Sequence, residues 1–282
     1  EGIGHLPLAV MDQGDMALVP DPAFPIYPAA TWLAGAEVRL VPLSEERGFL
    51  PDLRSLSAGD LKRARLLFLN YPNNPTGAVA DAAFFRGAVE FARDHGLVLL
   101  NDAAYSEVVY DGPRVSLLQT EGAKEVGIEF HSFSKTFNMT GWRLGFAIGN
   151  PDVIEALATV KDNVDSCVFT AIQRAGEVAL ALPDDRLAQQ VEIYRRRRDV
   201  LVDGLHKMGW NVPRPHATFY VWARVPTAEN SREFSARLLE RGQVVTTPGV
   251  GFGGNGDRYV RMALTTTEDR ISEAVSRIGR ML

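Results

Sequence analysis

The sequence predicts an α/β fold in which a mostly parallel sheet, covered by helices on both faces, is followed by a smaller α+β unit. Continuously apolar segments alternate with segments of helical periodicity over residues 16–148, as is typical of buried parallel strands and their crossover helices. Beyond residue 209, strands and helices are mixed. The 282 residues, 46% of them hydrophobic, are enough to bury two cores.

In the first part of the chain, the clearest helix is expected over residues 81–95. Apolar side chains recur there at spacings of three and four, Asp81 is a candidate N-cap, and Gly96 is a candidate C-cap. A further helix is expected over residues 26–34. The expected strands are residues 16–20, 38–41, 64–70, 97–101, 127–133 and 144–148.

In the second part, a long helix is expected over residues 185–208, where it would join two structural units. We therefore expect a large domain over residues 1–183 and a small C-terminal domain over residues 184–282. The other expected helices are residues 152–163, 171–182, 231–241 and 268–281, and the expected strands are residues 218–224, 244–247 and 259–264.

The composition excludes several classes of protein. The 30 Lys and Arg residues against 35 Asp and Glu give a net charge of −5, which argues against a general affinity for nucleic acid. No apolar run approaches the roughly 18 to 20 residues of a membrane span. The single cysteine, Cys167, excludes an internal disulfide and is expected to be buried. These features favour a cytoplasmic protein.

A run of four arginines, residues 195–198, lies on the expected long helix. Four consecutive residues point in all directions around a helix, so they form no single basic face. We expect salt bridges to Glu192 or Asp199 rather than nucleic-acid binding.

Four polar clusters lie at or near the ends of expected strands, where ligands bind in open α/β sheets. They are residues 70–77, Asp102 with Tyr105, residues 132–143, and Arg261. Each cluster alone has a structural explanation. Residues 70–77 could form a plain turn, and Asp102 could be a helix N-cap. Lys135 could be a surface lysine, and Arg261 could be solvated or form a salt bridge.

Together the clusters supply the parts needed to hold pyridoxal phosphate. A lysine can form a Schiff base with the aldehyde, and an aspartate can keep the pyridine nitrogen protonated. A tyrosine and an asparagine can bind the ring oxygen, and serines with an arginine can hold the phosphate. The apolar neighbours of Lys135 predict partial burial, which would lower the pKa of its amine.

These motifs resemble those of class I/II aminotransferases with the type I pyridoxal-phosphate fold, in both order and spacing and over the whole chain. The matching residues are NNPTG at 73–77, Asp102 with Tyr105, SFSK at 132–135, and Arg143. The stretches EGIGHLPLA at 1–9, YPNNPTGAV at 71–79 and GIEFHSFSKTFNMTGWRLG at 127–145 are similar, more narrowly, to LL-diaminopimelate aminotransferases.

The resemblance implies a role for each matching residue. Lys135 would bind the cofactor aldehyde and then carry the proton of the substrate α-carbon, and Asp102 would pair with the pyridine nitrogen. Tyr105 and Asn74 would bind the ring hydroxyl. The phosphate would be held by Ser132, Ser134 and Arg143.

Two further roles follow from the same resemblance. Phe24 occupies the position whose ring stacks on the pyridine, although an ordinary place in the core explains it equally well. Arg261 would clamp the substrate α-carboxylate, together with Asn74.

The implied activity is amino transfer between an amino acid and a 2-oxo acid, with LL-2,6-diaminopimelate and 2-oxoglutarate as the expected pair, in lysine biosynthesis. The alternatives are an aminotransferase for another amino acid (aromatic, alanine or aspartate), a β-elimination, and an inactive remnant. A homodimer is the family-based expectation. Family members carry a segment that would precede Glu1, so the chain is expected to be a fragment.

Overall fold

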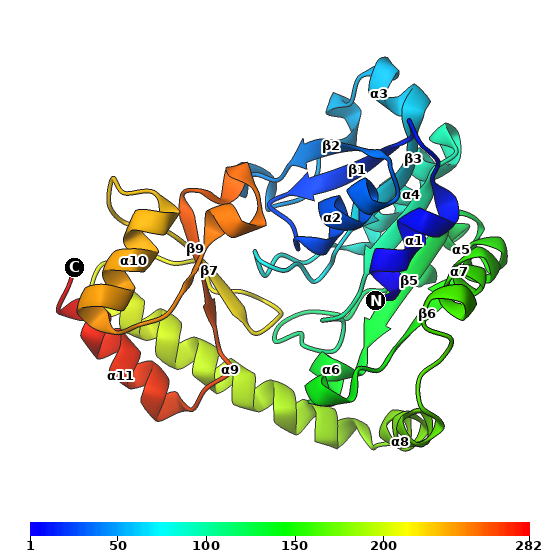
Figure 1. Cartoon of the computed structure of the whole chain (residues 1–282). Helices are drawn as coiled ribbons and strands as arrows, with labels where there is room; N and C mark the ends of the chain where they lie inside the picture. The colour runs from blue at the N-terminus through cyan, green and yellow to red at the C-terminus, as the bar shows by residue number, and fades with distance from the viewer.

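The computed structural model describes residues 1–282 and contains two sheets joined by a long helix (Figure 1). The larger sheet has the strand order β2-β1-β3-β4-β5-β6. All neighbouring strands are parallel except β6, which runs antiparallel to β5. The predicted mostly parallel sheet is therefore confirmed. Its strands are β1 (Met16–Asp21), β2 (Glu37–Pro42), β3 (Ala64–Leu69), β4 (Val98–Asp102), β5 (Gly127–Ser132) and β6 (Gly145–Gly149).

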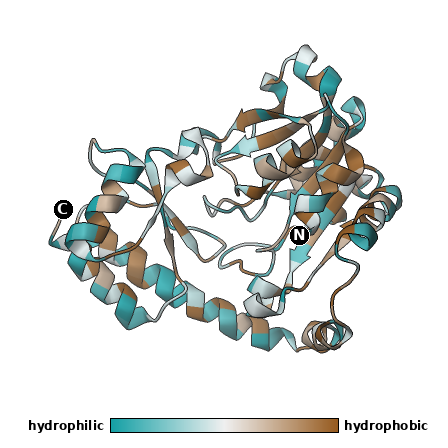
Figure 2. Cartoon of the chain, viewed as in Figure 1, coloured by the Kyte–Doolittle hydropathy of each residue, from teal (hydrophilic) through white to brown (hydrophobic).

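Helices cover both faces of this sheet, as predicted. Leu66 and Phe68 of β3 join the core beneath α1, α2 and α7, whereas Leu67 and Leu69 join the core beneath α4. Figure 2 shows the sheet as a largely brown, hydrophobic layer. The helices of this part are α1 (Gly2–Val10), α2 (Ile26–Leu33), α3 (Ala58–Arg63), α4 (Ala82–His95), α5 (Ala123–Val126), α6 (Phe133–Thr136), α7 (Pro151–Val164) and α8 (Thr170–Leu180).

The predicted ends of α4 are confirmed. The carboxylate of Asp81 accepts a hydrogen bond from the amide of Phe84 at 2.7 Å. Gly96 adopts the left-handed conformation, with φ of 64°, that ends many helices.

The second part of the chain forms a smaller antiparallel sheet with the order β7-β9-β8. Helix α9 runs from the neighbourhood of α8 to the small sheet and packs against α11 (Figure 1). A single core of 20 buried residues lies between this sheet and its helices and includes Tyr105, Val108 and Tyr110 from the loop after β4. The elements are α9 (Asp184–Lys207), β7 (Tyr220–Arg224), α10 (Ser231–Gly242), β8 (Thr247–Pro248), β9 (Tyr259–Ala263) and α11 (Glu268–Gly279).

Several elements differ from those expected. Helix α1 was not anticipated, although its Leu6 is completely buried, and neither were the short helices α3, α5 and α6. The strand expected over residues 244–247 was wrong except at its end, since β8 covers only Thr247–Pro248. The expectation that Cys167 is buried was wrong: it lies exposed in the connection between α7 and α8.

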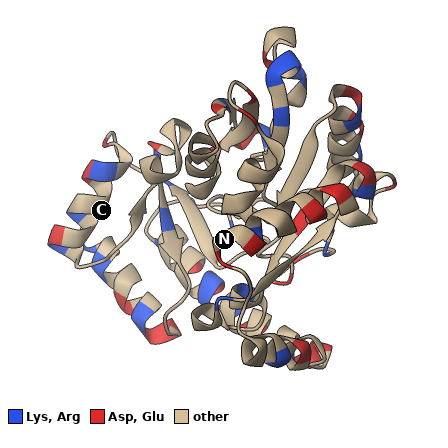
Figure 3. Cartoon of the chain, turned by 45° about the vertical axis from the view of Figure 1, so that its right-hand side comes forward, with Lys and Arg blue, Asp and Glu red and all other residues tan.

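The basic run on α9 forms the expected ion pairs. Arg195 pairs with Glu192 at 3.2 Å, and Arg198 pairs with Asp199 at 2.9 Å. Arg198 also reaches Asp111 at 2.8 Å and is only 4% exposed. Acidic and basic residues are interspersed over the outer helices in the view of Figure 3. None of the helices combines the length and the apolar composition needed to cross a membrane.

A buried carboxylate, Glu129 on β5, connects its strand to β4 and to the loop at residues 116 and 117. It accepts hydrogen bonds from Asn101 Nδ2 at 2.9 Å, Ser116 Oγ at 2.6 Å and the amide of Leu117 at 2.8 Å. Burial raises the pKa of Glu129, but hydrogen bonds from His131, Ser116 and Asn101 outweigh it, so the net pKa is lowered.

We therefore expect Glu129→Ala to lower the free energy of unfolding by about 2–4 kcal/mol, because it leaves several buried donors without an acceptor. Denaturant unfolding measures this change. Glu125→Ala, at an exposed position, is the control and should change stability by about 0.5 kcal/mol or less. The part of this loss that depends on the ionised carboxylate should be full above the ordinary glutamate value of 4.5 and decrease as the pH falls through the lowered pKa. Equal losses of stability in Glu129→Ala and Glu125→Ala would contradict the stabilising role assigned to the Glu129 carboxylate.

Candidate active site

The four polar clusters of the sequence come together where the carboxyl ends of β3, β4 and β5 face the small sheet. Arg261 Nη1, on β9, donates to Asn74 Oδ1 at 2.8 Å. The charges of Asp102, Arg143 and Arg261 all act on the amine of Lys135. Residues from four separate stretches of sequence thus form one site.

The turn after β3 is held by its own asparagines. Asn70 Oδ1 accepts from the amide of Asn74 at 2.8 Å, and Asn70 Nδ2 donates to the carbonyl of Asp102 at 2.6 Å. Asn73 Oδ1 accepts from the amide and the hydroxyl of Thr76. Gly77 has φ of 73°, and a Cβ there would lie 2.9 Å from Pro215. The turn therefore has a fixed shape that presents the side chain of Asn74 to Arg261.

Asp102, at the end of β4, is a buried carboxylate that forms no ion pair. Oδ2 accepts from the hydroxyl of Tyr27 at 2.8 Å, and Oδ1 accepts from the amide of Ala104 at 3.2 Å. Burial raises the pKa of Asp102, whereas the bonds from Tyr27 and Ala104 and the charge of Lys135 oppose that shift. The carboxylate does not cap a helix, so the N-cap interpretation was wrong.

Lys135 lies on α6, directly after β5, and is half-buried as its apolar neighbours predicted. Its Nζ is 5.9 Å from the centroid of the Phe219 ring. Gln190 Nε2, on α9, donates to the Lys135 carbonyl at 2.8 Å and holds the short helix in place. Burial lowers the pKa of the amine, the charges of Arg143 and Arg261 lower it further, and Asp102 opposes them. A larger fraction of the amine is therefore neutral and nucleophilic than in a free lysine.

Ser132, Ser134 and Arg143 lie around Lys135. Ser132 caps α6, since its Oγ accepts from the amide of Ser134 at 3.3 Å. Arg143 adopts φ of 54° and donates through Nη1 to the carbonyl of Thr140 at 3.0 Å. The guanidinium is exposed and forms no ion pair, so it is free to bind an anion.

Phe24 is not a core residue: 41% of it is exposed. Its ring meets that of Tyr27 edge to face, with centroids 6.0 Å apart. Because Tyr27 binds Asp102, the exposed ring stands close to the buried carboxylate, and the alternative of an ordinary core position is wrong.

Arg261 is a partly buried guanidinium with no carboxylate in contact. Its Cζ lies 4.0 Å from the Tyr220 ring centroid and 4.6 Å from that of Phe252, so two aromatic rings hold it. Its Nε is buried and has no hydrogen-bond partner. Such an unpaired cation suits the carboxylate of a ligand.

Tyr105 completes the site from the loop after β4. It is 4% exposed, and its hydroxyl lies 3.3 Å from that of Tyr220. Burial raises the pKa of the phenol well above its ordinary value, and Tyr220 and Asp102 reinforce the shift. The group stays protonated and can donate a hydrogen bond at neutral pH.

Three contributing residues were missed from the sequence: Tyr27, Tyr220 and Phe252. The alternation along β7 and β9 could have signalled Tyr220, which lies on the same face as Arg261 once the strands are paired. Tyr27 and Phe252 carry no such local signal, because their contacts depend on tertiary packing.

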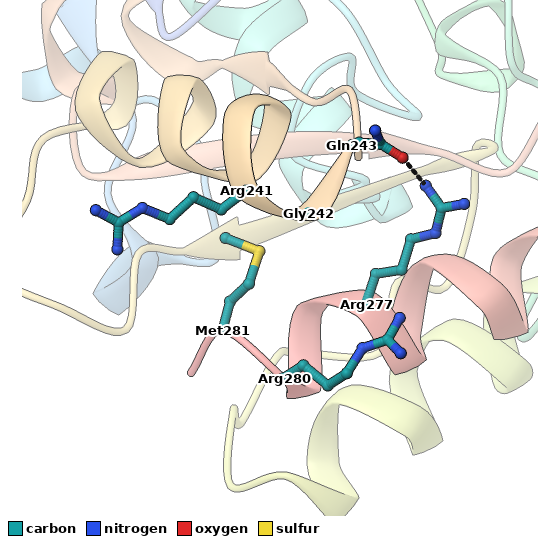
Figure 4. A pocket seen from close by; sticks show the side chains of 6 residues that line it. All are labelled: Arg241, Gly242, Gln243, Arg277, Arg280 and Met281. Atoms are coloured by element: carbon teal, nitrogen blue, oxygen red, sulfur yellow. Dashed lines mark hydrogen bonds between the residues drawn. The ribbon is translucent and has the colours of Figure 1, made fainter.

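A cavity of about 500 Å³ lies away from this site, between α10 and α11 (Figure 4). It is lined by Arg241, Arg277 and Arg280 among others, but the three guanidinium groups point in different directions (Figure 4). Arg277 is bound to Gln243 at 3.2 Å. The arginines do not converge on one ligand position, so the cavity is not a second candidate centre.

The raised pKa of Asp102 means that its buried charge costs stability. We expect Asp102→Asn to raise the free energy of unfolding of the ligand-free chain at pH 7 by about 0.5–2 kcal/mol. Below the ordinary value of 3.8 the aspartate is protonated in both states, so the gain should vanish there and grow as the pH rises. Denaturant unfolding across pH tests this. Asp94→Asn, at an exposed position on α4, should show no such gain, and a loss of stability in Asp102→Asn would contradict the interpretation.

The comparisons with known proteins agree with this geometry. The family model described as aminotransferase class I and II matches residues 1–278. The LL-diaminopimelate aminotransferase of Moorella thermoacetica is 52% identical over 283 residues, covering 100% of this chain and 73% of the relative. The apo structure of BacF from Bacillus subtilis has a TM-score of 0.97 at 43% identity, covering 99% of this chain and 72% of that one.

A third relative has a different named substrate. The aromatic aminotransferase of Pyrococcus horikoshii OT3 has a TM-score of 0.94 at 31% identity, covering 100% of this chain and 76% of that one. The match of the family model over nearly the whole chain, together with these identities, establishes the family. The chain belongs to the class I and II aminotransferases.

Proposed function

We propose that this chain transfers an amino group between LL-2,6-diaminopimelate and 2-oxoglutarate, with pyridoxal phosphate held at the Lys135 site. One observation carries the proposal: an amine of lowered pKa shares a site with a buried carboxylate, Asp102, and an unpaired guanidinium, Arg261. The name of the 52% identical relative supports the choice of diaminopimelate.

The residues of the site fit pyridoxal phosphate. Asp102 is buried without a cation, and a protonated pyridine nitrogen would offset the cost of its burial. Arg143 carries an exposed guanidinium without an ion pair, which suits a phosphate. The phosphate would also contact Ser132 and Ser134, the ring would stack on Phe24, and the ring hydroxyl would bind Tyr105 and Asn74.

The cofactor, when bound, supplies a ring that accepts electrons from the α-carbon of the substrate. Asp102 would keep the ring nitrogen protonated, and Lys135 would hold the cofactor through its aldehyde. The neutral Nζ of Lys135 would also accept the proton of the substrate α-carbon. The donor set of this chain therefore matches the steps that amino transfer requires.

Arg261 and Asn74 would orient the substrate. The Asn74 amide already holds one end of the guanidinium at 2.8 Å, which leaves the other nitrogens to bind the α-carboxylate. Because aromatic rings flank the guanidinium, water is partly excluded and the ion pair is strengthened.

An aromatic amino acid is the second candidate substrate. The 31% identity to an aromatic aminotransferase favours it, and the Arg261–Asn74 pair would bind only the α-carboxylate that all amino acids share. Parallel assays with LL-diaminopimelate, phenylalanine, alanine and aspartate, each with 2-oxoglutarate, decide between them. Turnover of phenylalanine without turnover of diaminopimelate would refute the first assignment.

We also propose that the chain forms a homodimer and that it is cytoplasmic. Large apolar side chains are exposed along the end of α7 and along α8, which is typical of an interface. These residues are Val164 (59%), Phe169 (72%), Val178 (68%) and Leu180 (59%).

We further propose a large domain over residues 1–183 and a small domain over residues 184–282. The boundary lies where the long helix α9 begins, at Asp184, because this helix lies between the two sheets in sequence.

Cofactor binding can be tested without turnover. We expect pyridoxal phosphate to give a visible absorption band with the wild-type chain, because Lys135 forms a Schiff base with the aldehyde. Lys135→Ala should abolish the band, whereas Lys124→Ala, at an exposed position, should retain it. Absence of the band from the wild type would leave an inactive remnant as the conclusion.

The carboxylate clamp is tested at Arg261. We expect Arg261→Lys to lower kcat/KM for the amino donor by about 10²–10³-fold, because lysine cannot bind a carboxylate through two parallel hydrogen bonds. Arg241→Lys, at an exposed position on α10, is the matched control and should leave steady-state kinetics unchanged. A loss of less than threefold in Arg261→Lys would show that the substrate carboxylate binds elsewhere.

A further inference from the structure

Tyr220 contacts both halves of the candidate site. Its hydroxyl lies 3.3 Å from the hydroxyl of Tyr105, and their rings meet edge to face with centroids 5.8 Å apart. On the other side, the guanidinium of Arg261 lies over the ring face, 4.0 Å from the centroid. The Tyr220 side chain therefore lies between Tyr105, which is assigned to the cofactor hydroxyl, and Arg261, which is assigned to the substrate carboxylate, and it contacts both.

The backbone around Tyr220 is firmly held. Its amide donates to Thr218 Oγ1 at 3.1 Å, and Thr218 in turn donates its amide to the carbonyl of Val108 at 2.8 Å. Ala217 and Val109 form an isolated antiparallel bridge. Because residues 105–109 lead directly from Tyr105, these bonds fix the distance between the two tyrosines.

In the ligand-free chain the hydroxyl of Tyr105 donates to the hydroxyl of Tyr220 at 3.3 Å. Tyr105 is buried and protonated, so its proton is available for the oxygen of a bound ring. When that oxygen takes the proton of Tyr105, the Tyr220 hydroxyl would rotate and donate to the Tyr105 oxygen, which would make Tyr105 a stronger donor toward its ligand.

We propose that Tyr220 is a positioning residue that orients Tyr105 through its hydroxyl and Arg261 through its ring. The two functions belong to different atoms of one side chain and can be separated by substitution. This inference rests on the proposed function, because it assumes that Tyr105 faces the cofactor and Arg261 the substrate.

Tyr220→Phe removes only the hydroxyl, whereas Tyr220→Leu removes the hydroxyl and the ring. We expect both variants to raise the pKa of the visible band of bound pyridoxal phosphate by roughly half a unit, because a weakened Tyr105 donor favours the protonated form. We expect KM for the amino donor to change less than about twofold in Tyr220→Phe and to rise about five- to tenfold in Tyr220→Leu. Tyr194→Phe is the matched control, since Tyr194 packs on Phe219 with centroids 5.2 Å apart, and it should leave both readouts unchanged.

A second readout needs no cofactor. In thermal unfolding of the ligand-free chain, Tyr105→Phe combined with Tyr220→Phe should lower Tm by less than the sum of the two single variants, because they remove the same hydrogen bond. Strict additivity would overturn the proposal.

The outcomes separate this inference from the function it rests on. A wild-type chain without the visible band overturns both. A wild-type band whose pKa is unchanged in Tyr220→Phe, or equal KM values in the Phe and Leu variants, overturns the role of Tyr220 alone. A purely structural role would lower Tm in both variants without moving the pKa of the band.

Discussion

The site depends on two charged side chains that are buried without an oppositely charged partner. Asp102 is 7% exposed and has no cation in contact, and Arg261 has a buried Nε without a partner. Each arrangement costs folding free energy, because a buried charge is stable only when a partner compensates for its lost hydration. A ligand that carries a cation for Asp102 and an anion for Arg261 recovers that cost on binding, which makes the site selective for such a ligand.

A network of buried hydrogen bonds fixes the strand ends that carry the site. Asn70 Nδ2 donates to the carbonyl of Asp102, Asn101 Oδ1 accepts from the amide of Tyr71, and Asn101 Nδ2 donates to Glu129. These bonds connect the ends of β3, β4 and β5. Because the buried polar groups bond to one another, the network holds the backbone of Asp102 in a defined position.

Most of the fold could be predicted from the sequence because its signals are local. The apolar runs of β1, β3, β4 and β5 and the caps of α4 at Asp81 and Gly96 depend on neighbouring residues alone. The site clusters were found for the same reason, since each is a short motif at a strand end. The role of Tyr27 could not be predicted, because its bond to Asp102 spans 75 residues of sequence. The strand alternation places Tyr220 on the face of Arg261, but its contact with Tyr105 spans 115 residues and has no local signal. Cys167 was misplaced because small apolar residues also occupy exposed connections.

The groups assigned to the cofactor and to the substrate carboxylate lie in different parts of the chain. Asp102 ends a strand of the large sheet and Lys135 lies on the helix after β5, whereas Arg261 and Tyr220 belong to the small sheet. Several side-chain hydrogen bonds connect the two parts. Asn255 binds Asp21 at 3.3 Å, Tyr259 binds Glu45 at 3.1 Å, and Arg261 binds Asn74 at 2.8 Å. All three bonds involve a carboxylate or a guanidinium, and one of them uses Arg261, so a ligand that competes for Arg261 also alters how the sheets are held together. Substrate binding and the relative position of the two sheets are therefore linked through the same guanidinium.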